Sequence, residues 1–308
     1  MAGLDRQTGI AVACSISAMA LFGLIDNFIR LAAETGSLWQ FHLMRSMVAL
    51  SLLWVVARVL GTTLRVLQPR RVAVRTFFAA SAMVIYFGCL GMMPIAQAVA
   101  GLFTAPIFVV IFSIVIWREK IGPRRLLAVA LGFAGIVLVL RPDLNGPGPI
   151  TVLPIAAGAF HALGNLTTRR WCAAESTFGL LTAFFIAMML IGAVGVVAMG
   201  LTVHAPPDGP EGYVFRSLVP VEGAFLWVTL VQGVGSLIGV GLMLRSYQLG
   251  DPALISVVEN TLLVFATIWA VVLWGEVPGP VALVGLVLIV SAGLIVSARS
   301  EPAVTRPV

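Results

Sequence analysis

A few polar side chains interrupt long apolar stretches of this sequence, and they are the residues with which it could do chemistry. Asp26-Asn27 lies late in the first such stretch, and Glu259-Asn260 lies about two helical turns after Asp251-Pro252. His161 and Asn165 are four positions apart, so they would share one face of a helix. Such groups could bind a polar solute, and a histidine, which titrates near neutral pH, could carry a coupling proton.

Each of these residues also has a structural interpretation. Asp26 could pair with Arg30 one turn later at a membrane interface, and His161 with Asn165 could be a neutral helix contact. Glu259 is the deepest acidic residue of the second half of the chain, and a charge inside the bilayer is costly unless it is paired or hydrated. We therefore predict a substrate or proton role for Glu259, with hydrogen-bonded packing as the alternative.

Arg45 and several aromatic residues complete the candidate site. Arg45 lies inside the second apolar stretch, where we predict a structural ion pair with Asp26 or Glu34. Tyr86, Gln97 and Phe103 could line a cavity for a planar or amphipathic solute, although aromatic side chains at helical spacing are also common in packing. The predicted substrate-binding set is Asp26, Asn27, Tyr86, Gln97, Phe103, His161, Asn165, Glu259 and Asn260.

The elements that must position these residues are membrane helices. Of the 308 residues, 60% are hydrophobic and 10% are charged, whereas soluble domains are about 25% charged. A membrane-spanning helix needs about 20 apolar residues. Segments that meet this requirement run approximately over 9–30, 38–58, 76–93, 95–117, 124–141, 151–168, 177–200, 222–244, 253–274 and 279–298. We predict an all-α membrane protein with ten transmembrane helices in a lipid bilayer.

Basic residues gather on one side of the predicted helices. If the N-terminus is inside, 15 of the 19 basic residues, Arg75 among them, fall in inner connections or at the termini. The outer side keeps only Arg30, Arg141 and Arg216. Because cytoplasmic loops carry an excess of lysine and arginine, both termini are predicted to face the cytoplasm of a bacterial inner membrane.

The sequence also repeats itself. A pattern recurs at an offset of 157 positions, as Thr104, Phe108, Ile111, Trp117, Glu119 and Gly122-Pro123, then Thr261, Phe265, Ile268, Trp274, Glu276 and Gly279-Pro280. We predict one repeat at 1–145 (helices 1–5), a second at 146–300 (helices 6–10) and a cytoplasmic tail at 301–308. Five helices in each half make the repeat inverted, and inverted repeats place substrate sites near the midplane between the halves.

Several motifs resemble the EamA domain of the drug/metabolite transporter (DMT) superfamily. They are Pro94-Ile95-Ala96-Gln97-Ala98, Phe103-Thr104-Ala105-Pro106-Ile107-Phe108, Trp117-Arg118-Glu119-Lys120-Ile121-Gly122 and Gly132-Phe133-Ala134-Gly135. The resemblance implies a ten-helix, two-repeat secondary transporter that works by alternating access. Its expected substrate is a small organic metabolite, such as an amino acid or a cofactor-like solute such as S-adenosylmethionine or riboflavin.

Other functions find less support in the sequence. It contains no HExxH, GxxxxGK[ST] or GxSxG motif, so no catalytic residue, metal or cofactor is predicted. A membrane channel and an intramembrane enzyme remain the alternatives. The basic residues are not interleaved with aromatics, so nucleic acid is not an expected partner. Without a nucleotide motif, a gradient, a coupling proton or a counter-substrate would drive transport. A homodimer is compatible with the sequence, which does not fix the oligomeric state.

Overall fold

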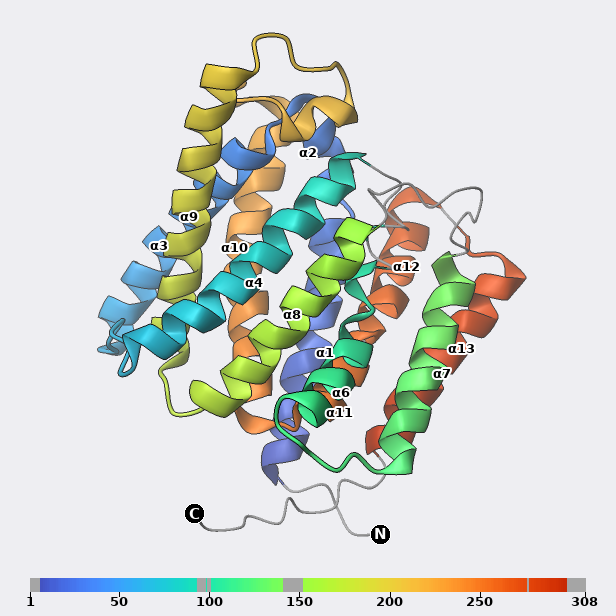
Figure 1. Ribbon diagram of the computed structural model, residues 1–308. Coiled ribbons are helices and arrows are strands. Elements are labelled where there is room, and N and C mark those ends of the chain that lie inside the picture. The colour runs from blue at the N-terminus through green and yellow to red at the C-terminus, as the bar shows by residue number, and fades with distance from the viewer. Residues whose placement is uncertain (1–5, 93–97, 99–100, 141–151, 276, 298–308) are drawn as a thin grey trace.

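The computed structural model describes residues 6–92, 98, 101–140, 152–275 and 277–297, and these residues form helices and connections without a strand (Figure 1). In chain order the elements are α1 (Arg6–Asp26), α2 (Ile29–Thr35), α3 (Leu38–Leu60), α4 (Pro69–Met92), α6 (Ala105–Val115), α7 (Pro123–Leu140), α8 (Val152–Trp171), α9 (Thr177–Thr202), the 3₁₀ turn η2 (Pro210–Val214), α10 (Gly223–Leu249), α11 (Pro252–Glu259), α12 (Thr261–Trp274) and α13 (Pro280–Ser297).

The helices have the length and surface of a multi-pass membrane protein. Within the described residues, six helical stretches are long and apolar enough to cross a bilayer, and three shorter apolar helices accompany them. Large apolar side chains such as Val59, Val194 and Val287 are exposed on the outside. Such a surface is poorly solvated by water and well solvated by lipid tails. The predicted ten spans are more than these six stretches, so the number of spans stays a prediction.

Three of the helical spans that the sequence predicts are interrupted. The first breaks between α1 and α2, the fourth just before α6, and the ninth at Asn260 between α11 and α12. At two of the breaks a threonine hydroxyl donates to a backbone carbonyl three residues earlier, Thr104 to Gly101 at 2.6 Å and Thr261 to Val258 at 2.7 Å. Side chains that bond the backbone in this way compete with the helical hydrogen bonds.

Pro106 lies at the start of a helix. It is the second residue of α6, directly after the break at Thr104. The first turn of a helix has no internal partner for its N–H groups, so a proline is tolerated there.

The two halves of the chain match each other at the offset of the sequence repeat. The breaks at Thr104 and Thr261 are 157 positions apart, and so are the first residues of α7 and α13, Pro123 and Pro280. Arg118 and Gly275, also 157 positions apart, have φ angles of 52° and 70°. A non-glycine residue rarely adopts this left-handed conformation. The backbone thus keeps the same turn in both halves even where the residue disfavours it.

Helix packing follows the same relation. α1 packs along α10 and α4 along α8, while α3 packs on α9 and α7 on α13. In the predicted repeat, α1, α3, α4 and α7 correspond to α8, α9, α10 and α13. Exchanging each helix for its counterpart converts the α1–α10 contact into the α4–α8 contact. The α3–α9 and α7–α13 pairs are unchanged by the exchange. This is the pattern that the predicted two-fold relation between the halves would produce. The domain boundaries at 145 and 300 stay predictions.

Polar contacts tie the connections together at both ends of the bundle. Glu175 in the α8–α9 connection accepts hydrogen bonds at 2.7 Å from the amides of Leu67 and Gln68, which precede α4. At the opposite end, at the top of Figure 1, the connection between α9 and α10 carries Arg216, which donates to the Gly36 carbonyl at 2.9 Å. Arg75 does not lie in a connection as expected. It is buried within α4, and its Nε donates to Thr168 Oγ1 at 2.9 Å.

Candidate functional site

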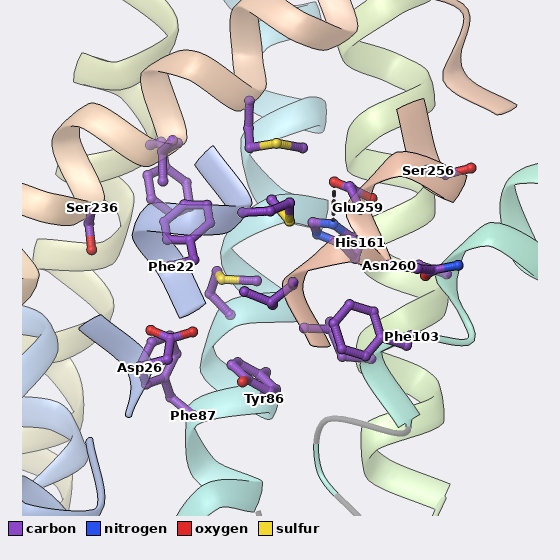
Figure 2. A pocket seen from close by; sticks show the side chains of 18 of the residues that line it. Phe22, Asp26, Tyr86, Phe87, Phe103, His161, Ser236, Ser256, Glu259 and Asn260 are labelled. Carbon is purple, nitrogen blue, oxygen red and sulfur yellow. Dashed lines mark hydrogen bonds and ion pairs between the residues drawn. The ribbon is translucent and has the colours of Figure 1, made fainter. Parts of the chain in front are cut away.

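A cavity lies in the centre of the bundle and is lined from both halves of the chain (Figure 2). Most of its surface is apolar, with methionine and phenylalanine side chains prominent. The lining residues are Met19, Phe22, Asp26, Arg45, Met83, Tyr86, Phe87, Leu102, Phe103, Ala105, Pro106, His161, Phe184, Gln232, Ser236, Val240, Met243, Ser256, Glu259, Asn260 and Leu262. An apolar pocket with a few convergent polar groups is typical of a small-molecule site.

Asp26 and Arg45 form one polar region of the cavity. Asp26 is the last residue of α1, and its Oδ1 accepts from Gln232 Nε2 on α10 at 2.9 Å. Ser236 lies one turn later on α10, and its hydroxyl donates to Gln232 Oε1 at 3.3 Å. Arg45 NH1 on α3 donates to Ser236 Oγ at 3.4 Å. Three hydrogen bonds in series therefore connect the guanidinium to the carboxylate.

This arrangement replaces the predicted ion pair of Arg45 with Asp26 or Glu34. Instead of a direct contact, two neutral side chains of α10 link the charges, and the Arg45 Cζ atom lies 5.2 Å and 5.0 Å from the ring centroids of Phe41 and Phe87. The cation–π contacts with the rings stabilise the guanidinium where it is removed from water. Helix α10, distant in sequence, supplies the linking residues, so the pattern around Arg45 could not reveal which residues bond it.

Glu259 forms the second polar region, on the other side of the cavity in Figure 2. It is the last residue of α11, and its Oε2 accepts from the Tyr247 hydroxyl at 2.8 Å. Its Oε1 lies 3.3 Å from His161 Nε2 and 3.5 Å from Asn165 Nδ2, both on α8. The carboxylate is 5% exposed and has partners on two other helices. A carboxylate in contact with an imidazole can exchange a proton with it or bind a cation.

The structure brings six of the nine predicted residues to this cavity: Asp26, Tyr86, Phe103, His161, Glu259 and Asn260. Asn165 is not among the lining residues and instead contacts Glu259. Asn27 bonds the carbonyls of Gly23 and Ala266 at 2.6 Å and 3.3 Å, so it stabilises the α1 break. Gln97 lies outside the described residues. The substrate-binding role of the set stays a prediction.

Sequence reasoning missed several polar groups of the cavity and its surroundings. Gln232 and Ser236 are four positions apart on an apolar helix, the same spacing that identified His161 and Asn165, so the signal was present. Tyr247 follows Arg245 near the end of α10, and nothing local indicates its contact with Glu259. Among the described residues, no group of three histidine, cysteine or acidic side chains could hold a metal ion.

Part of the chain is similar to a known protein family. Residues 9–141 match the EamA-like transporter family. An uncharacterized transporter of Helicobacter pylori is 24% identical over 280 residues, which cover 90% of each chain. A riboflavin transporter of Rhizobium johnstonii is 25% identical over 76% of this chain and 72% of its own. A pseudopaline exporter of Pseudomonas aeruginosa is 23% identical over 94% and 96%, respectively.

The fold also has a solved counterpart. A crystal structure of a protein with 20% sequence identity superposes with a TM-score of 0.75, covering 93% of this chain and 98% of the other. The TM-score shows a common fold, and at this sequence identity the similarity shows nothing beyond the fold.

Proposed function

We propose that the chain is a transporter of the drug/metabolite transporter superfamily that moves a small organic metabolite across the membrane by alternating access. The match of residues 9–141 to the EamA-like transporter family and the similarity to transporters over most of the chain support this proposal. The observation that carries the proposal is the central cavity, to which both halves of the chain contribute charged residues. Transporters built from inverted repeats have their substrate sites near the bilayer midplane between the repeats, next to interrupted helices.

Alternating access needs two conformations of similar free energy that open to opposite sides. The matching turns at Arg118 and Gly275, and the packing that maps onto itself when the halves are exchanged, support such a pair of states. Counting each interrupted helix as one span, the chain would cross the bilayer ten times. The contact of His161 with Glu259 favours a proton as the coupling ion, with exchange of a counter-substrate as the alternative.

Purified protein in liposomes tests the transporter proposal directly. We expect saturable counterflow of a labelled metabolite that an excess of unlabelled solute inhibits. Liposomes loaded with unlabelled amino acids, S-adenosylmethionine or riboflavin would identify the class of solute. Flux that does not saturate would indicate a channel, and chemical conversion of the solute would indicate an enzyme. Either result would overturn the proposal.

We also propose that both termini face the cytoplasm, because the basic residues gather at one end of the bundle and the 203–222 connection lies at the other. Reporter fusions placed after Val308 and within this connection should report opposite sides of the membrane. The same side for both fusions would contradict the ten-span arrangement.

A further inference from the structure

One edge of the Arg45 guanidinium has no hydrogen-bond partner among the described residues. The side chain is 3% exposed and lines the cavity, and its NH1 group bonds Ser236. Its Nε and NH2 atoms are buried and have no hydrogen-bond partner among the described residues. Buried donors are normally satisfied, and an unsatisfied charged group destabilises a structure. Nε and NH2 form the edge of arginine that binds a carboxylate through two parallel hydrogen bonds.

Asp26 carries a negative charge in the same cavity, but it does not bond the Nε/NH2 edge of Arg45. Asp26 lines the same cavity and reaches Arg45 only through Gln232 and Ser236. Opposite charges attract strongly in a low-dielectric interior, so a separated pair must be kept apart by the packing around it. Here the rings of Phe41 and Phe87 fix the guanidinium, and the end of α1 fixes Asp26.

A separated pair of this kind is complementary to a zwitterion. We propose that Arg45 and Asp26 form a head-group site for an α-amino acid moiety of the transported solute, with its carboxylate on the Nε/NH2 edge of Arg45 and its ammonium group on Asp26. The inference rests on the proposed transport function and names the class of its substrate. Both charges of the solute would be neutralised, and so would both charges of the protein, which lowers the cost of burying them.

The rest of the cavity suits the remainder of such a solute. Met19, Phe22, Met83 and Met243 line the same cavity and present apolar and polarisable surface to it. Flexible methionine side chains adapt to different apolar shapes. The site would therefore accept an amino acid with an apolar or thioether side chain, and Glu259 could contact a cationic group at its far end. A neutral solute such as riboflavin would leave both head-group charges uncompensated.

Matched analogues test the head-group site on the full-length protein. The probes are L-methionine, L-phenylalanine and S-adenosylmethionine, then L-methioninamide, which lacks the carboxylate, 4-(methylthio)butanoate, which lacks the ammonium group, and riboflavin. Thermal stabilisation of the purified protein reports binding, because a ligand that binds the native state raises its stability. Counterflow in liposomes reports transport. We expect the analogues that lack one group to bind at least tenfold more weakly than the parent amino acid.

Two variants separate the two contacts. Arg45→Met should lose binding of both the amino acid and 4-(methylthio)butanoate by at least tenfold. Asp26→Asn keeps an oxygen that can accept from Gln232 but loses the charge, so the amino acid should then bind no better than 4-(methylthio)butanoate. Arg75→Met is the matched control, since Arg75 is also buried and lies outside the cavity lining. It should lower thermal stability without changing the preference among the probes.

The outcomes distinguish this inference from the proposed function. Amide and free amino acid binding equally well, or an Asp26→Asn protein that still prefers the amino acid, would overturn the head-group site. So would transport of riboflavin with no response to any amino acid, although the transporter proposal would then stand. Absence of flux for every probe and for a cell metabolite extract would overturn both. If Arg45→Met does not fold, the head-group site is still tested by the Asp26→Asn variant and by the comparison of analogues on the wild type.

Discussion

Two helix breaks lie at equivalent positions in the two halves, but they bring different side chains to the cavity. The first half carries Leu102-Phe103 before Thr104, and the second half carries Glu259-Asn260 before Thr261. Both threonines make the same hydrogen bond to a backbone carbonyl three residues earlier. The backbone geometry is therefore kept in both halves, whereas ionisable chemistry is present at only one break.

The comparison indicates that the two halves share the backbone geometry of the break and differ in the side chains next to it. The proposed alternating access needs comparable hinges in both halves, and we propose that the breaks at Thr104 and Thr261 supply them. Recognition of a solute needs an asymmetric set of groups, since the solute itself has no two-fold symmetry. In this proposal Glu259 contributes to recognition.

The largest expected effect concerns Glu259, the residue that distinguishes the two breaks. Glu259→Gln keeps the shape and a hydrogen-bonding group toward Tyr247 but removes the charge. Flux should fall about tenfold or more, equivalent to roughly 1.4 kcal/mol in the limiting step. Thermal stability should change little. Counterflow in liposomes, normalised to the amount of protein, checks this, and wild-type flux would remove Glu259 from the mechanism.

Glu175→Gln is the matched control for the loss of a buried carboxylate. Glu175 accepts two backbone amides at 2.7 Å and lies outside the cavity lining. A neutral amide can accept one of them well but presents an N–H group to the other. We expect lower thermal stability with the preference among solutes unchanged, the reverse of the Glu259 result.

The second prediction concerns the α7–α13 pair, in which the two halves meet symmetrically. A Cβ atom at Gly135 would lie 2.6 Å from the Gly285 carbonyl oxygen, so Gly135→Ala must push the helices apart. The expected loss of stability is about 1 to 3 kcal/mol, as for other overpacked interiors. Gly122→Ala, which has open space around it, should be nearly neutral in the same thermal unfolding experiment. Equal stabilities of the two variants would contradict this close approach.

The smallest effect tests whether the two breaks are energetically equivalent. Thr104→Val and Thr261→Val each remove one hydroxyl hydrogen bond, and each should cost about 1 kcal/mol. Thr202→Val removes a similar bond at an exposed helix end and should cost less. Thermal unfolding in detergent measures all three. Clearly unequal losses at Thr104 and Thr261 would show that the two hinges differ, and would weaken the case for alternating access.

The sequence predicts the helical fold better than the detailed site. Apolar length locates the spans, and the 157-position repeat predicts the matching starts of α7 and α13. The interruption at Asn260 was not predicted, because hydropathy does not detect a threonine hydroxyl that competes for a backbone carbonyl. Apolar composition therefore predicts where the spans lie, but it does not predict the interruptions between α1 and α2 and between α11 and α12.

For the site, the sequence predicted some of the residues but not the contacts between them. Glu259 and His161 could be nominated because a polar residue stands out within an apolar helix. Their direct contact could not be predicted, since it depends on how α8 packs against α11. Arg45 was also found, but its surroundings were not. Ser236 accepts from Arg45 although it lies 191 positions away, and Gln232 links Ser236 to Asp26; no local pattern carries that information.

The contact between α7 and α13 has a consequence for the synthesis of the protein. Equivalent residues of the two helices are 157 positions apart, and ribosomes add about 5 to 20 residues per second, so α7 precedes its partner by roughly 8 to 30 s. During that time the surface at Gly135, which packs against Gly285 and Ile289 of α13, has only lipid or another protein to contact. A chain truncated before Pro280 would be released into the membrane with that surface uncovered.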